Sequence, residues 1–511
     1  MTVSNSSHQY NHCCCWYHHS LSVVLLLLLL LLLLCKAADG PDRPFVCCWR
    51  SHRGGGVVAA VLEDPGGAPA GSAGVARGGQ PLPGDPAAAA VHVRRPGPPQ
   101  ALRPHLHHAD GAAHPHHRQL PRPYTRGAGP DGPPFRQPPC RLPPTRLLFS
   151  SGNCTVNSAP YGPLWRTLRR NFVSEIVCPA RVKQFGWIRD WAMANHLARL
   201  RAEFEATGAV QMISNCRLTI CSILACICFG ARVPENHVRV IEEVLKEVMM
   251  MTTPKLPDFL PVFTPFFRGQ LTEARKLRKR QMDCLAPLLR ARRAFVESGG
   301  KCDPSSPWEM VSPVGEAYLD SLLCLEPTGK GRLRDEELVT LCSEVMSAGT
   351  DTSATMLEWA MLHLVLDQSA QDQLYEEIVE KVGRDKGRKI TESDVEGMSY
   401  LQAVVKETMR RHPPSHFVLS HAATRETELG GYRVPADASV EFYTAWVTEN
   451  PSTWKDPGEW RPERFMEGGE GWETDITGTR SIRMMPFGSG RRICPALPWG
   501  CFTSSSCWRG W

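Results

Sequence analysis

The segment 486–494, with the sequence PFGSGRRIC, constrains this chain most strongly, because it surrounds one cysteine with two glycines, an aromatic side chain and basic residues. Glycines allow a tight turn that brings backbone N–H groups close to the sulfur of Cys494. Phe487 would exclude water from the same sulfur. A cysteine thiolate that ligates a metal needs such shielding and such hydrogen-bond donors. Taken alone, the segment also fits an ordinary buried cysteine in a Gly/Arg loop.

The pattern Phe-x-x-Gly-x-Arg-x-Cys resembles the haem-binding signature of the cytochromes P450. The resemblance implies haem b as the cofactor, with Cys494 as its axial metal ligand and with Phe487 and Gly490 beside the thiolate. Arg492 would then meet a haem propionate. Three further motifs follow in the order and at the distances typical of the family. The resemblance covers about residues 145–496, which we expect to form the P450 domain.

The segment 348–353, AGTDTS, lies inside a helical pattern that runs from about Asp335 to Leu366. Positions 348, 351 and 352 share a helical face, so we expect the carboxylate of Asp351 and the hydroxyl of Thr352 to line one patch. Small and polar residues here also favour a local kink. The segment resembles the oxygen-activation motif of P450s, which makes Thr352 and Asp351 the expected catalytic residues. A Ser/Thr-rich segment that only packs closely is the alternative.

A second motif, Glu407 to Arg410, lies in an amphipathic segment from Tyr400 to Arg411 that two following prolines must end. On an exposed helix this i, i+3 pair would contribute only tenths of a kcal/mol. In P450s, however, the arginine of Pro-Glu-Arg-Phe joins such a pair in a buried triad. The resemblance therefore implies a structural triad of Glu407, Arg410 and Arg464 behind the haem.

Trp165 and Arg169 are four residues apart, so they share one face of a predicted helix. In the P450 family a tryptophan and an arginine at such positions contact a haem propionate, which suits a multidentate guanidinium. A solvated basic helix is the competing interpretation. His421 is another expected propionate partner, although Ser420 stands where relatives commonly have proline.

Segments between these motifs, such as HFVL at 416–419 and GYRVP at 431–435, are most similar to plant microsomal A-type P450s of the family 89 group. The implied fold is mainly α with a small β portion, incomplete in the N-terminal sheet region and after the haem loop. A chain of 511 residues can bury one such large helical domain. The net charge of +6 is too small to indicate nucleic-acid binding.

Residues 21–38 are almost continuously apolar and include a run of leucines from 25 to 34. No Lys or Arg precedes the apolar run, which ends at Cys35, whereas Lys36, Arg43 and Arg50 follow it, so residues 1–20 are expected in the lumen and the part after the anchor in the cytosol. We therefore predict a single-pass signal anchor in the endoplasmic reticulum membrane. A cleaved secretory signal is the alternative, but its basic leading region is missing.

Residues 45–143 interrupt the family pattern. They contain no Lys, Ile, Met or Asn, are rich in Pro, Gly, Ala, Arg and His, and show no sustained helical or strand period. Out-of-frame translation, a genuine disordered insert and a weak metal site at the histidines between 105 and 117 are the three interpretations. Residues 497–511 likewise lack the helix that packs beneath the haem in P450s, so we expect an aberrant tail.

The resemblance implies a haem-thiolate monooxygenase that inserts one oxygen atom of O2 into a small hydrophobic substrate. Its electrons would come from NADPH-cytochrome P450 reductase at the membrane. Twenty cysteines without a regular spacing agree with a catalytic domain on the reducing, cytosolic side. Two alternatives remain open at this stage: a haem-binding but catalytically inactive remnant of a frameshifted gene, and a product that does not fold.

Overall fold

The computed structural model describes most of the chain after position 154 and three short strands before it. The described residues are 45–52, 55–62, 93–94, 155–251, 268–327, 330–383, 394–395, 397–423, 425–429, 431–436, 438–476 and 482–496. Several predicted segments lie outside these residues, namely the lumenal N-terminus 1–20, the signal anchor 21–38, the histidines between 105 and 117, and the tail 497–511.

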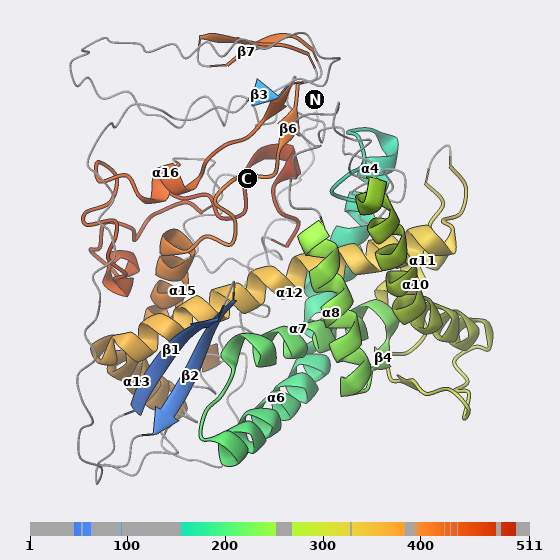
Figure 1. The fold of residues 1–511 in the computed structure, drawn as a ribbon, viewed down its shortest axis with the longest axis horizontal. Helices are drawn as coiled ribbons and strands as arrows, with labels where there is room; N and C mark the ends of the chain where they lie inside the picture. The colour runs from blue at the N-terminus through green and yellow to red at the C-terminus, as the bar shows by residue number, and fades with distance from the viewer. Residues whose placement is uncertain are drawn as a thin grey trace, which may run out of the picture.

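Helices dominate the described part of the chain (Figure 1). The α-helices are α4 (Pro163–Phe172), α5 (Pro179–Gln184), α6 (Gly186–Thr207), α7 (Met212–Phe229), α8 (Glu235–Met251), α10 (Arg268–Glu297), α11 (Tyr318–Leu323), α12 (Asp335–Leu366), α13 (Gln368–Val382), α15 (Ser399–Arg411) and α16 (Ala445–Thr448). Tighter or wider single turns are η3 (Val173–Val177), η5 (Pro462–Phe465) and η6 (Gly490–Arg492). In Figure 1, α12 runs through the middle of the fold.

The strands are short and form small antiparallel sheets. They are β1 (Phe45–His52), β2 (Gly55–Leu62), β3 (Val93–Arg94), β4 (Ala231–Arg232), β5 (Glu309–Met310), β6 (His421–Ala422), β7 (Thr427–Leu429), β8 (Tyr432–Val434) and β9 (Ser439–Val440). Three sheets are the pairs β1–β2, β4–β5 and β7–β8, and a fourth has the order β3-β9-β6. The prediction of a mainly helical fold with a small β portion is confirmed.

The strands β1 and β2 correct one expectation. The segment 45–143 was expected to contain no regular element, yet β1 pairs with β2 in a hairpin in which Phe45 lies opposite Leu62 and His52 opposite Gly55. Valine and aromatic residues, which favour strands, are frequent in these two short stretches. Averaged over the whole segment they are much less frequent, so the strand pattern is not apparent there. The hairpin lies against α12 and α7.

The long helix α12 begins and ends at the predicted residues. Asp335, Glu336 and Glu337 occupy its first turn, where carboxylates interact favourably with the unpaired N–H groups of the helix. The carboxylate of Glu337 also accepts a hydrogen bond from the backbone N–H of Arg334 at 3.0 Å. Helical hydrogen bonding continues through 348–353, so the expected kink does not interrupt the helix.

Helix α7 is the central core helix. Among the described residues it alone is apolar and long enough to cross a membrane, with a mean hydropathy of 1.8, but 78% of it is buried inside the protein. It packs against α6, α8 and α12. Gly349 of α12 allows a close approach, because a Cβ atom there would lie 2.7 Å from Cδ1 of Leu224 in α7.

The Glu407 carboxylate joins α15 to the segment that precedes the cysteine loop. Arg410 donates to it at 2.6 and 2.8 Å, Arg464 of η5 at 3.3 Å, and the backbone N–H of Arg461 at 2.9 Å. Both guanidinium groups also donate to backbone carbonyl groups of the segment 448–459. The structure thus brings together the three residues of the predicted triad, all of them almost fully buried.

Four stacked rings connect the end of α12 to the end of α15. Trp359 stacks on His412 with ring centroids 3.7 Å apart, and His363 stacks on Trp460 at 4.8 Å. The two imidazoles share a hydrogen bond of 2.7 Å between their Nε2 atoms. Burial, reinforced by nearby cationic and imidazole groups, lowers the pKa of His363 to about 4 and the pKa of His412 to about 3.

We predict that Glu407→Gln lowers the free energy of unfolding by about 3–5 kcal/mol, because Arg410 and Arg464 would remain buried without their carboxylate. Urea titration followed by circular dichroism measures the change. Glu428→Gln, at an exposed position, is the control and should stay within about 0.5 kcal/mol of the unsubstituted protein. Equal stability of both variants would contradict a role for the buried cluster.

The imidazole pair predicts a loss of stability in mild acid. The unfolded chain binds protons at these histidines near pH 6.5, whereas the folded chain binds them only near pH 4 and pH 3. Each imidazole therefore lowers the free energy of unfolding by at most about 1.4 kcal/mol per pH unit below pH 6.5. Replacing both His363 and His412 by Phe should reduce this slope, and His237→Phe should not. An unchanged slope in the double variant would contradict the assignment.

Candidate active site

The loop before Cys494 is shaped by glycines in the left-handed region. Gly488 has a φ of 72° and Gly490 a φ of 74°, a conformation that residues with a Cβ rarely adopt. The turn closes with a hydrogen bond from the backbone N–H of Cys494 to the carbonyl group of Phe487, at 2.9 Å. The ring of Phe487 packs against the main core. The sequence therefore folds here into a tight turn that ends at Cys494.

The Cys494 side chain is partly buried, and its charge depends on neighbouring groups. Burial raises the pKa of the thiol above its usual range, while the backbone N–H of Ala496 and the guanidinium of Arg169 oppose that rise. Arg169 comes from α4 and donates to the carbonyl group of Ile493 at 2.6 Å. A cation is thus held beside the sulfur by a contact between α4 and the cysteine loop.

Arg492 and Trp165 lie against each other. The guanidinium of Arg492 is 4.9 Å from the centroid of the Trp165 ring and donates to the carbonyl group of Ala159 at 2.7 Å. The indole N–H of Trp165 donates to the carbonyl group of Val156 at 3.0 Å. Trp165 therefore supports Arg492 in this structure, whereas the family resemblance implied a propionate contact for its indole.

His421 is a buried residue with an unsatisfied ring atom. Its Nδ1 has no hydrogen-bond partner among the described residues. Burial lowers the pKa of this imidazole, and the positive charge of Arg492 lowers it further. Arg492 itself has a pKa lowered to about 10, first by burial and then by Arg169. Arg492 is thus close enough to repel both His421 and Arg169, although the three groups come from the cysteine loop, β6 and α4.

The two residues of the predicted oxygen motif take different partners. Thr352 is exposed, and its hydroxyl donates to the carbonyl group of Ala348, one turn earlier, at 2.7 Å. The carboxylate of Asp351 instead forms an ion pair with Arg217 of α7, which also binds Glu242 of α8. The two side chains therefore have different partners in this structure, because α7 supplies a cation to the carboxylate.

Two positions of this site were missed by the sequence analysis. Arg217 is the only charged residue of α7, and an isolated charge in an apolar helix was a usable signal. Glu344 of α12 accepts the backbone N–H groups of Val156 at 3.0 Å and Asn157 at 2.7 Å. It lies four and eight residues before Ala348 and Thr352, a spacing that was also readable.

These observations fit a haem with two propionates. The chain offers one shielded sulfur, two arginines and a buried imidazole nitrogen without a described partner, all of which influence one another. Carboxylate groups would relieve the repulsion among the basic side chains. Among the described residues no cluster of three His, Cys, Asp or Glu could hold a metal ion, so a single thiolate ligand is the metal chemistry available.

Comparisons with known proteins agree with this site. The family model described as Cytochrome P450 matches residues 145–496. Cytochrome P450 89A9 of Arabidopsis thaliana is 36% identical over 364 residues, which cover 69% of this chain and 68% of that protein. Tryptamine 5-hydroxylase of Oryza sativa subsp. japonica is 31% identical over 363 residues, which cover 70% of this chain and 67% of that protein. The predicted similarity to plant family 89 is confirmed.

Solved structures show the same fold. A zebra fish cytochrome P450 with progesterone has a TM-score of 0.57 at 21% identity, covering 74% of this chain and 81% of the other. The retinoic acid-bound cyanobacterial CYP120A1 has a TM-score of 0.56 at 18% identity, covering 74% and 76%. This chain therefore belongs to the cytochrome P450 family, whose members are monooxygenases that use haem b, a redox partner and hydrophobic substrates.

Proposed function

We propose that this chain inserts one oxygen atom of O2 into a small hydrophobic organic substrate, with electrons from NADPH-cytochrome P450 reductase. The observation that carries the proposal is the convergence of Arg169, Arg492 and His421 beside the shielded sulfur of Cys494. When bound, the haem supplies the oxygen-binding and oxidising chemistry, and the protein supplies binding, orientation and electrostatics.

In this proposal the thiolate of Cys494 would hold the haem iron, and the cradle formed by the tight turn before it would keep the sulfur shielded. Phe487 and Gly490 shape that cradle through ring packing and a left-handed backbone. Arg492 and His421 bind the propionates. Arg169 balances the negative charge of the thiolate, because it is already held beside the cysteine loop. A thiolate ligand in turn pushes electron density that favours cleavage of the O–O bond.

Thr352 is the proposed proton donor of the reaction. Its hydroxyl is exposed, and the hydrogen bond to Ala348 fixes the direction of the Oγ1 atom. Asp351 directly precedes it in the chain but is held by Arg217, so its carboxylate acts on the proton supply only through that ion pair. Asp351 is therefore proposed to control the delivery of protons to Thr352. The Oγ1 atom of Thr352 is the last protein atom that holds the proton.

The proposed location is the endoplasmic reticulum membrane, with a single span and the catalytic domain on the cytosolic side. The apolar run 21–38 and the basic residues that follow it support this orientation. A reductase in the same membrane would reach the domain from the cytosol. Glu407, Arg410 and Arg464 serve this function only as structural residues.

Carbon monoxide difference spectra of the reduced protein test the haem ligand. We expect a band near about 450 nm from a thiolate-ligated haem, and its loss in Cys494→Ala. Cys324→Ala, at an exposed position elsewhere, should retain the band. Identical spectra of the protein and the Cys494→Ala variant would remove the basis of the proposal. A normal band without NADPH-dependent turnover would instead identify a haem-binding but inactive protein.

Replacement of Thr352 tests proton delivery. In Thr352→Ala we expect NADPH consumption to continue while product formed per NADPH falls by at least about tenfold, because the proton donor at Oγ1 is gone. The matched control is Thr207→Ala, since Thr207 makes the same hydrogen bond to a carbonyl group one turn earlier, at 2.8 Å, but at the end of α6. Unchanged coupling in Thr352→Ala would contradict the assigned role.

A further inference from the structure

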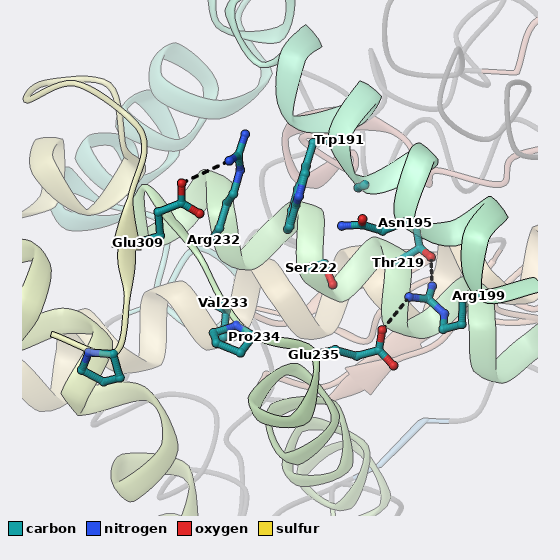
Figure 2. A pocket seen from close by; sticks show the side chains of 12 residues that line it. Trp191, Asn195, Arg199, Thr219, Ser222, Arg232, Val233, Pro234, Glu235 and Glu309 are labelled. Carbon is teal, nitrogen blue, oxygen red and sulfur yellow. Dashed lines mark hydrogen bonds and ion pairs between the residues drawn. The ribbon is translucent and has the colours of Figure 1, made fainter. Parts of the chain in front are cut away.

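A second cavity lies away from the cysteine loop. It has a volume of about 320 Å³ and is enclosed by α6, α7, the β4 strand, the start of α8 and the β5 strand (Figure 2). None of the residues assigned above to the haem, to proton delivery or to the buried triad lines it. Its volume lies at the lower end of the range found for small-molecule sites.

Two ion pairs set the charge of this cavity. Arg199 pairs with Glu235 at 3.2 Å, and Arg232 pairs with Glu309 at 3.2 Å (Figure 2). The guanidinium of Arg199 is fixed further by the side chain of Asn215, to which its Nε donates at 2.8 Å. Each cation is therefore matched by a carboxylate, so the cavity offers no net charge to a ligand and favours a neutral one.

An indole ring forms one wall. Arg232 covers one face of Trp191, with its guanidinium carbon 5.6 Å from the ring centroid. Asn195 lies one helical turn further along α6, and Figure 2 shows Trp191 standing between Arg232 and Asn195. Trp191 also lines the cavity, so a flat ring can pack against its indole there. Pro234 and Pro307 add apolar surface to the lining.

The cavity offers both donors and acceptors of hydrogen bonds, and the Nε–H donor of Arg232 is buried without a described partner. The hydroxyl of Ser222 donates to the carbonyl group of Leu218 at 2.8 Å, which leaves its oxygen as an acceptor. The amide of Asn195 makes no hydrogen bond to any described residue, so its Oδ1 can accept and its Nδ2 can donate. A ligand that carries an N–H or O–H group would satisfy these acceptors.

We propose that this cavity is a second ligand site for a neutral, flat ring compound with an N–H or O–H donor on its edge, of which phenol is the simplest probe. The ring packs against the indole of Trp191. The edge donor binds Oδ1 of Asn195 or Oγ of Ser222. The balanced ion pairs disfavour ionised analogues, because an added charge would compete with an existing partner.

Fluorine NMR of the full-length, haem-loaded protein labelled with 5-fluorotryptophan tests the site. Trp191→Phe identifies the Trp191 signal by its absence. With phenol we expect a saturable shift of that signal. In Asn195→Ala the half-saturation concentration should be at least about threefold higher, because one hydrogen bond to phenol is lost. Trp187→Leu is the matched control, because Trp187 also stacks with Arg232, at 5.8 Å, but does not line the cavity.

Three results would overturn the proposal. The first is a Trp191 signal that phenol does not move at any concentration the protein tolerates. The second is an unchanged half-saturation concentration in Asn195→Ala while the remaining tryptophan signals show an intact fold. The third is equal binding of toluene, which has the ring but no donor, since the acceptors of Asn195 and Ser222 would then play no part.

Discussion

The buried carboxylate of Glu407 is the interaction on which the rest of this structure depends. An uncompensated charge in such a position would cost several kcal/mol, so its partners must all be in place before the region is stable. Those partners come from α15, from η5 and from the backbone of Arg461. The cluster therefore fixes how the chain returns from α15 toward the cysteine loop. The buried cluster contributes a defined geometry more than it contributes added stability.

The surroundings of Cys494 couple cofactor binding to folding. Arg492 lowers the pKa of His421 and Arg169 lowers the pKa of Arg492, while Glu344 is the carboxylate that opposes the lowering for both arginines. Glu344 is already bound to two backbone N–H groups. A ligand with two carboxylates would relieve the repulsion and bind only the folded chain. Haem would thus stabilise the same contacts that hold it.

Local patterns in the sequence predicted α12 and α15, and the family resemblance implied the triad. The bounds of α12 followed from a sustained helical period, and the pairing of Glu407 with Arg410 from their spacing. The partner of Asp351 could not be predicted in this way. Arg217 is 134 positions away, and which way a helical carboxylate turns depends on the neighbouring helix. The carbonyl group of Val156, which accepts from the indole of Trp165 in this structure, could not be predicted for the same reason.

Helix α12 sets the distances between three residues that have separate roles in the structure. Glu344 anchors the segment before α4, Thr352 carries the hydroxyl proposed as the proton donor, and His363 joins α15 through His412. At 1.5 Å per residue, these groups are separated by about 12 and about 16 Å along the axis. They also stay within about a quarter turn of one another, since eight and eleven residues are close to whole numbers of turns. Losing one residue between them would rotate everything beyond it by about 100°, which separates His363 from His412 while leaving the helix itself intact.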